Sequence, residues 1–258
     1  MTVVTDPWIS DYTEQKEADF RRLLGMHARV CQAIMARYGG QPYLYVDLYA
    51  GPGRLEYEGR EFDGSPLIAR NTLAEIGLPY RGVHFDRDPE VADRLHDALG
   101  LGAEVYDMSC QEGFPEWLAA QPRQSQRLGL VYSDPINDEI PHELLNAAAQ
   151  KFPKVDLLSY VAATQYKRRR GSDPTRPYLA DHIAAVDKRV VLVREPLGAW
   201  HWTFILWTNW VDLKEWRKRG FYRLDSRDGE RVLDRLNLSK REAHEAANTP
   251  LPLFEESW

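Results

Sequence analysis

Hydrophobic positions along the chain follow two different periods. Between residues 13 and 38, apolar side chains recur every three or four residues, which predicts one long amphipathic helix that ends at Gly39-Gly40. Beyond it, short apolar, β-branched or aromatic runs predict strands separated by segments of helical period. The seven predicted strands span residues 43–50, 81–88, 103–108, 127–134, 154–161, 188–195 and 201–208.

Capping and turn residues divide these runs. Ser65-Pro66 and Asp88-Pro89 each place a capping side chain before a proline at the first helical position, and Gly100 ends the second helix. Strands that alternate with helices predict parallel crossovers and a doubly wound sheet. Only five residues separate the last two strands, which is too short for a crossover helix, so these strands should pair antiparallel.

The composition of the chain says more about its possible binding partners than about its fold. The 258 residues include 33 Lys and Arg against 39 Asp and Glu, a formal net charge of −6, so a nucleic-acid partner would need a local basic patch. No apolar run approaches the roughly 18 residues of a membrane span. The first residues do not resemble a signal peptide, so we expect a cytoplasmic protein with no membrane partner. Cys31 and Cys110 are expected to be buried thiols.

The first predicted strand runs into the sequence YVDLYAGPGR, residues 45–54, which joins an acid to a tight glycine turn. Glycine loops that bind phosphate stand directly at a helix N-terminus. Here eleven residues, RLEYEGREFDG, separate the glycines from the helix expected at Ser65. A phosphate cradle is therefore disfavoured, and S-adenosylmethionine, which carries no phosphate, is favoured. Gly51 and Gly53 would let the backbone approach this ligand closely.

Three acids at the ends of successive strands complete the predicted cofactor site. Asp47 suits the ammonium group, directly or through water; Asp86 suits the ribose hydroxyls; and Asp107 suits the adenine amino group. Since parallel strands end at one edge of a sheet, these carboxylates should line one crevice. For Asp86 and Asp107, capping or strand-end solvation stays an alternative. The predicted cofactor-binding residues are Asp47, Tyr49, Ala50, Gly51, Gly53, Asp86, Asp107 and Met108.

Seven strands that are parallel except for a final hairpin resemble the class I S-adenosylmethionine-dependent methyltransferase fold. This resemblance predicts an α/β protein with a doubly wound, mostly parallel, Rossmann-like sheet and a C-terminal antiparallel hairpin. It covers about residues 41–210, which we expect to form a methyltransferase-like domain. Residues 1–40 and 211–258 are expected to be helical extensions.

Three motifs carry a closer resemblance. They are YVDLYAGPGR, then DGSPLIA at residues 63–69, and SDP at residues 133–135. Together they resemble the three-Cys-motif partner family of bacterial methyltransferase-like proteins, most strongly over the first 140 residues. The resemblance implies binding of S-adenosylmethionine and pairing with a separate protein that bears a three-cysteine motif.

The fourth strand ends at Asp134-Pro135, which resembles part of the D-P-P-Y motif of amino-methyltransferases acting on adenine or cytosine. That motif holds the exocyclic amine of a flipped-out base and stacks an aromatic side chain on it. This chain continues with Ile136-Asn137, so the second proline and the aromatic residue are absent and base specificity stays open. We predict that Asp134 and Pro135 are catalytic, with Asp134 orienting or deprotonating the nucleophile; an ordinary strand-ending turn is the alternative.

Loops that follow parallel strands emerge on the cofactor side of the sheet. Basic side chains near aromatic ones suit phosphate contact and base stacking, although a solvated surface is the alternative and tryptophans in a hairpin are typical of a core. KEWRKR at residues 214–219 is interpreted as a solvated helix face. The predicted substrate-binding residues are Tyr166, Lys167, Arg168, Arg169, Arg170 and Trp200.

The sequence thus predicts a methyltransferase that transfers a methyl group from S-adenosylmethionine to a nucleophile. An amine of a nucleic-acid base is one candidate acceptor. A non-catalytic partner protein with this fold and a methyltransferase of a small metabolite are the alternatives. The seven histidines show no paired metal-ligand spacing and there is no GxSxG elbow, so neither a metal site nor a serine hydrolase is predicted.

Overall fold

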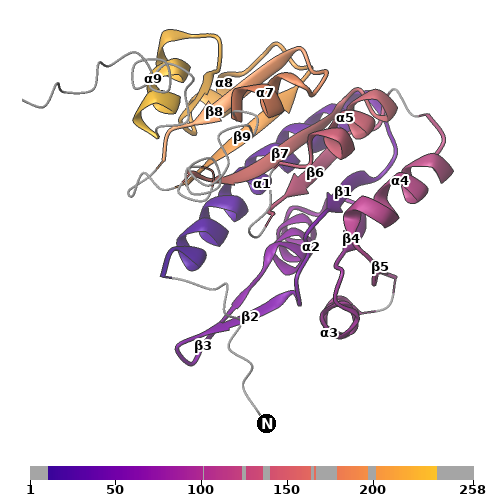
Figure 1. Ribbon diagram of the computed structural model, residues 1–258. Coiled ribbons are helices and arrows are strands. Elements are labelled where there is room, and N and C mark those ends of the chain that lie inside the picture. The colour runs from indigo at the N-terminus through magenta and orange to yellow at the C-terminus, as the bar shows by residue number, and fades with distance from the viewer. Residues whose placement is uncertain are drawn as a thin grey trace, which may run out of the picture.

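An eight-stranded sheet forms the centre of the molecule (Figure 1). The computed structural model describes residues 11–100, 102–123, 126–135, 140–163, 166, 179–196 and 202–236. The strands lie in the order β10-β8-β9-β7-β6-β1-β4-β5. They are β1 (Tyr43–Asp47), β4 (Tyr80–Phe85), β5 (Glu104–Tyr106), β6 (Gly129–Ser133), β7 (Val155–Ala162), β8 (Val190–Arg194), β9 (Trp202–Thr208) and β10 (Phe221–Arg223).

The predicted fold class is confirmed. β1 pairs in parallel with β4 and β6, and the pairs β4–β5 and β6–β7 are parallel too. β9 lies antiparallel between β7 and β8, which forms the predicted C-terminal hairpin. The sheet has one strand more than predicted, because β10 adds to β8 in antiparallel orientation. Its three residues are too few to show a period in the sequence.

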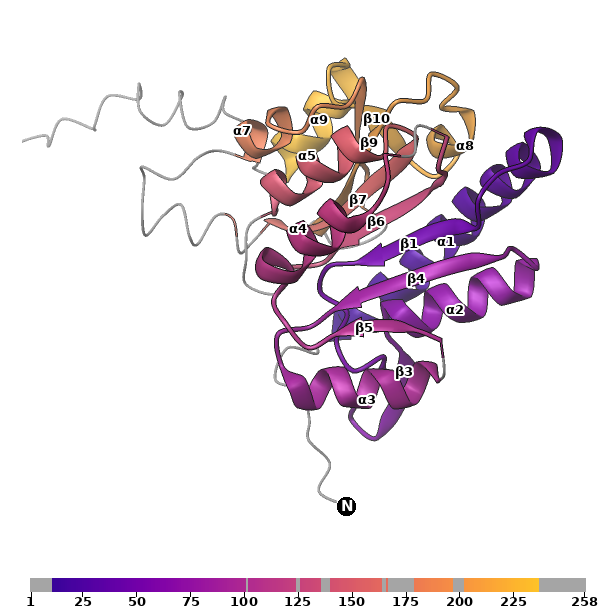
Figure 2. The same ribbon diagram turned by 90° about the vertical axis from the view of Figure 1, so that its right-hand side faces the viewer.

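Helices cover both faces of the sheet. α1 (Asp11–Tyr38), α2 (Ser65–Ile76) and α8 (Lys214–Arg217) pack on one face. α4 (Cys110–Ala120), α5 (His142–Lys151), α7 (Leu179–Ala184) and α9 (Arg227–Arg235) pack on the other. α3 (Pro89–Leu99) lies beside β5 at the sheet edge (Figure 2). Within the described residues, no helix combines the length and apolarity that crossing a membrane would require.

α1 is part of the core, not an outlying segment. The Phe20 ring stacks on Tyr132 of β6, with ring centroids 4.2 Å apart. Further along, the ring of His27 lies 3.2 Å from the Asp156 carboxylate of β7 and 2.8 Å from the Tyr43 hydroxyl of β1. The predicted apolar stripe of this helix is confirmed as far as Cys31, whereas Tyr38 at its end is 72% exposed. The N-terminal half of α1 lies at the carboxyl ends of β6 and β7.

Local capping agrees with the sequence at one helix and differs at another. Asp88 caps α3 by accepting the Glu90 N–H at 3.0 Å, as predicted. The predicted cap at Ser65 is wrong by one residue: Gly64 is the N-cap of α2, and Ser65 is buried as its first helical residue. The Ser65 side chain instead hydrogen-bonds to Asp47 at the end of β1.

The polar stretch after the glycine turn forms a hairpin that the sequence did not predict. β2 (Arg54–Tyr57) and β3 (Arg60–Asp63) pair antiparallel, and the hairpin projects from the body of the molecule (Figure 1). Its turn has positive φ angles at Glu58 and Gly59. The hairpin returns the chain to the glycine turn, where the Gly64 N–H donates to the Gly53 carbonyl at 2.7 Å.

Candidate cofactor and acceptor site

Four acids lie at or just after the carboxyl ends of neighbouring strands. Asp47 ends β1, and Asp86, Asp107 and Asp134 follow the ends of β4, β5 and β6. Because these strands are parallel neighbours, their carboxyl ends share one edge of the sheet, which is where open α/β sheets bind ligands. The glycine turn lies in the middle of this edge, between β1 and α2.

The glycine turn is held in a fixed conformation with open space beside it. Gly51 and Gly53 have φ angles of +64° and +76°, in the left-handed region that favours glycine. The Gly51 N–H donates to Asp86 Oδ2 at 2.9 Å. A Cβ atom on Gly51 would meet nothing within 4 Å, so there is room for a ligand to approach this part of the turn. The residues present therefore fit a cofactor that lies against the backbone.

Asp47 stabilises this turn through its hydrogen bonds. Its side chain is fully buried, accepting the Tyr45 hydroxyl at 2.8 Å and the Tyr49 N–H at 3.3 Å. Burial raises the pKa of Asp47 to about 6, against the lowering effect of its hydrogen bonds from Ser65, Tyr45 and Tyr49. A contact between Asp47 and the cofactor stays a prediction, whereas its part in shaping the turn is clear.

Asp86 connects two backbone segments. Besides Gly51, it accepts the Asp88 N–H at 3.0 Å through Oδ1. Burial raises the pKa of Asp86, in opposition to these two N–H donors. Asp88, in contrast, caps α3, so the two neighbouring acids have separate structural parts. Asp86 is half-buried and its carboxylate lies beside the open space at Gly51.

The β5 side of the crevice is more open. Asp107 is exposed, and Met108 is half-buried. Gly113 of α4 leaves room for Met108, because a Cβ atom there would lie 2.5 Å from the Met108 sulfur. Gln111 of the same helix donates to the Tyr49 hydroxyl at 3.2 Å, which joins α4 to the glycine turn. Ala50 is buried, with its N–H donating to the Phe85 carbonyl at 3.0 Å.

Gly53→Ala should be more destabilising than Gly51→Ala. Both replacements force an L-residue into a left-handed conformation, at about 1–2 kcal/mol. At Gly53 the new Cβ would also lie 2.8 Å from Leu95 Cδ1, which adds overpacking of about 1–3 kcal/mol. Urea unfolding of both variants measures the difference. Equal destabilisation would contradict a tightly packed turn at Gly53.

The β6 end of this sheet edge contains an ion pair between α1 and the residue that follows β6. Lys16 Nζ donates to Asp134 Oδ2 at 2.5 Å, and the two side chains are only 16% and 12% exposed. The Tyr132 hydroxyl donates to the same oxygen at 3.4 Å. Lys16 also lies over the Tyr160 ring, 5.1 Å from its centroid. Both of these donors use Oδ2, which leaves Oδ1 of Asp134 as the oxygen for a ligand.

Glu17 adds a second buried carboxyl group beside Lys16. Its Oε1 lies 3.4 Å from Lys16 Nζ, and burial raises the pKa of Glu17 to about 7, although the Lys16 charge opposes this. For Lys16 itself, burial disfavours the ammonium. The charges of Asp134 and Glu17 outweigh burial, so the pKa of Lys16 is raised and it stays charged. The group thus has more acids than bases, and Glu17 can change protonation near neutral pH.

Glu17→Gln should remove a pH-dependent loss of stability. Since folding raises the pKa of Glu17 from 4.5 to about 7, its contribution favours the folded state below pH 4.5 and is lost as the pH rises through 7. Relative to wild type, the variant should gain about 1–3 kcal/mol between pH 5 and pH 8. Urea unfolding at both pH values measures this gain. Glu14→Gln, an exposed change on the same helix, is the control and should show no such gain.

The remaining predicted residues lie in different places. Pro135 is buried next to Asp134. Tyr166 is half-buried; its hydroxyl accepts the Ile140 N–H at 3.4 Å and its ring meets His182 edge-on, so it packs against the core. Cys31 and Cys110 are free and buried, as expected. The predicted substrate-binding residues Lys167, Arg168, Arg169, Arg170 and Trp200 lie outside the described residues.

Comparisons with known proteins support the fold. No family model and no curated protein matches the sequence. Protein LPL1258 of Legionella pneumophila (family-model DUF519) is 12% identical, with a TM-score of 0.53 over 85% of this chain and 94% of that one. A probable spermidine synthase from Corynebacterium glutamicum is 8% identical, with a TM-score of 0.47 over 84% and 70% of the two chains. A methyltransferase from Geobacter sulfurreducens is 16% identical, with a TM-score of 0.39 over 73% and 77%.

At these sequence identities a structural likeness shows the fold alone, and no conclusion about activity follows from it. The fold is the Rossmann-like one of class I methyltransferases, as the strand order and the closing hairpin indicate. Membership of the three-Cys-motif partner family stays a prediction, and so does the division of the chain at residues 40 and 210.

Proposed function

We propose that the protein is a methyltransferase that uses S-adenosylmethionine. The observation that carries the proposal is that the glycine turn and the Asp134 carboxylate lie at the same edge of the sheet. The glycine turn, with open space at Gly51, lies at the end of β1, and the Asp134 carboxylate lies at the end of the neighbouring β6. The cofactor and the acceptor would therefore meet above the same two strands.

The charges at this edge suit S-adenosylmethionine. When bound, it supplies a methyl group activated by a positively charged sulfur. Glu17, Asp47 and Asp134 outnumber the Lys16 ammonium. Besides burial, the negative charges of Asp134 and Asp47 help to raise the pKa of Glu17, and the charge of Asp134 helps to raise the pKa of Asp47, so the three acids lie within electrostatic reach of one another. Asp86 would accept the ribose hydroxyls, and Asp107 would accept the adenine amino group beside Met108.

Asp134 suits an amine acceptor. Transfer to an amine forms a nitrogen–carbon bond as the sulfur–carbon bond breaks, and one N–H proton must leave the nitrogen. Oδ1 of Asp134 would accept a hydrogen bond from the amine and orient its lone pair. Lys16 Nζ donates to the other oxygen, Oδ2, of the same carboxylate. Asp134 and the nearby Glu17 are the acceptors available for the departing proton.

We further propose that this amine belongs to a nucleic-acid base, in keeping with the Asp134-Pro135 sequence at the strand end. Such a base must leave its stack to reach the crevice, so single-stranded substrate is favoured.

Two measurements test the proposed function. Calorimetry with S-adenosylmethionine should show binding by the wild-type protein, and labelled methyl groups should pass to RNA, DNA or the small-molecule fraction of a cell extract. A folded protein that binds no S-adenosylmethionine would overturn the proposal. Binding without transfer to any fraction would instead indicate a non-catalytic protein with this fold.

A further inference from the structure

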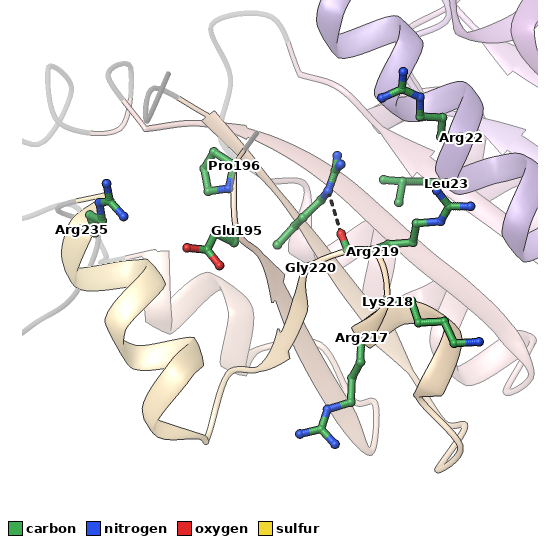
Figure 3. Close-up of a pocket in the computed structure, with 10 residues that line it drawn as sticks. Arg22, Leu23, Glu195, Pro196, Arg217, Lys218, Arg219, Gly220 and Arg235 are labelled. Atoms are coloured by element: carbon green, nitrogen blue, oxygen red, sulfur yellow. Dashed lines mark hydrogen bonds between the residues drawn. The ribbon is translucent and has the colours of Figure 1, made fainter. Parts of the chain in front are cut away.

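A basic cavity of about 590 Å³ lies between α1, the carboxyl end of β8 and the segment from α8 to β10 (Figure 3). Neither Asp86 nor Asp134 lines it, so it is separate from the site described above. Of its ten lining residues one is acidic and six are basic, namely Arg22, Arg194, Arg217, Lys218, Arg219 and Arg235. This concentration is unexpected in a chain with a net charge of −6.

A second cavity of about 570 Å³ continues this surface along α1. Arg22 and Arg219 line both cavities, and the second adds Arg21 and Arg29, together with Glu75 and Glu215. We call the basic residues Arg21, Arg22, Arg29, Arg217, Lys218, Arg219 and Arg235 the arginine track. The interpretation of residues 214–219 as a mere solvated face is thus incomplete, because Arg217, Lys218 and Arg219 line a cavity.

Some charges at this surface are already compensated. Arg194 is buried and pairs with Asp19 at 3.0 Å, and Lys218 pairs with Glu215 at 2.6 Å. The acid in the first cavity, Glu195, is paired with Arg231 at 3.3 Å.

Other charges at the surface are available to a ligand. The side chains of Arg29, Arg217 and Arg219 form no ion pair with any residue that the structure describes. Compensation of Glu195 by Arg231 also removes the main repulsion that an anion would meet in the first cavity.

The arginine track leads away from the acceptor end of the crevice. Lys16, which contacts Asp134, and Arg22 are six residues apart on α1, which is about 9 Å along the helix axis. Arg29 lies about 10 Å further along. β8 runs in the same direction as β7, so its carboxyl end lies at the same sheet edge as Asp134. A ligand on the track can therefore extend to the reaction site.

We infer that the arginine track binds the phosphodiester backbone of a single nucleic-acid strand whose acceptor base enters the crevice at Asp134. Several guanidinium groups spread over two adjoining cavities suit a chain of phosphates better than a single small anion. The planar guanidinium group also matches the geometry of phosphate oxygens. This inference rests on the proposed function, from which it takes the base as the methyl acceptor.

Binding of a fluorescein-labelled single-stranded RNA of about 20 nucleotides, followed by anisotropy at several salt concentrations, tests the inference. Arg217→Gln/Arg219→Gln should weaken binding at least about tenfold and reduce the slope of log affinity against log salt by about 1.4. Arg94→Gln/Arg123→Gln removes two exposed charges elsewhere and is the matched control. Its binding should stay within about twofold of wild type.

Three results would overturn the inference. The first is an equal loss in both double variants, which would indicate a general effect of charge. The second is displacement of the RNA by poly-glutamate as readily as by unlabelled RNA, which would indicate an acidic peptide. The third is no binding of RNA or of the matching DNA by wild type.

Calorimetry with S-adenosylmethionine separates failure of this inference from failure of the proposed function. If the wild-type protein binds the cofactor and methylates a small acceptor but binds no nucleic acid, only the inference about the arginine track fails. If the wild-type protein binds RNA as expected but binds no cofactor, the arginine track stands as a nucleic-acid surface and the proposed methyl transfer fails.

Discussion

Asp134→Asn should slow methyl transfer by at least about 100-fold while its affinity for S-adenosylmethionine falls far less. The asparagine keeps the shape of the side chain but cannot take a proton. The cofactor contacts predicted at β1, β4 and β5 are not touched by this change. Single-turnover transfer of labelled methyl, with calorimetry alongside, measures both quantities.

The part-buried ion pair between Lys16 and Asp134 means that this variant also changes stability, and the same pair supplies a control variant. Asparagine leaves the Lys16 ammonium without its closest counter-charge, so the protein will be less stable and rates must be measured well below the unfolding temperature. Lys16→Met/Asp134→Asn removes both charges and should recover stability without recovering the rate. An asparagine variant with the wild-type rate would show that Asp134 only ends a strand.

Arg194→Met should lower the free energy of unfolding by about 3–5 kcal/mol. Asp19 on α1 and Arg194 on β8 are 2% and 4% exposed, with 3.0 Å between their charged atoms. Removing the arginine leaves a buried carboxylate, whose nearest remaining cation is Arg22 at 3.7 Å on the surface. Arg194 Nε also donates to the Arg219 carbonyl at 3.2 Å, and this bond would be lost as well. Urea unfolding at neutral pH measures the loss.

Two further variants test whether the unpaired buried charge causes this loss of stability. Asp19→Leu/Arg194→Met replaces the pair by apolar side chains and should regain most of the stability. Glu215→Gln breaks the exposed pair with Lys218 and should cost less than about 1 kcal/mol. If Arg194→Met were as mild as Glu215→Gln, the pair would not hold α1 against the sheet.

The sheet could be predicted from the sequence because its signals are local. Runs of apolar residues marked seven strands, and the five-residue connection forced the final hairpin to be antiparallel. The strand-end acids followed from topology, since parallel strands end at one edge. The hairpin β2–β3 was not predicted, because each strand has only four residues and none of them is buried, which is too little to mark a strand by its apolar pattern.

Contacts between distant segments could not be predicted in this way. Lys16 and Asp134 are 118 residues apart, and the periodicity of α1 marks its apolar stripe but not the polar residue that reaches β6. The arginine track likewise combines residues of α1 with residues 217–219 and 235. Each of these segments alone has the composition of a solvated surface. The cavities form only because the fold places the segments side by side.

The position of α1 has a consequence for the spacing of any bound strand. Lys16, Asp19 and His27 fix this one helix to β6, β8 and β7, so it cannot slide or turn as a unit without breaking buried contacts. Arg22 and Arg29 are on the same helix as Lys16. If the arginine track binds a strand as proposed, the separation between the reacting base and its anchoring phosphates would follow the helical rise of about 1.5 Å for each residue. α1 would then fix the length of strand between the two.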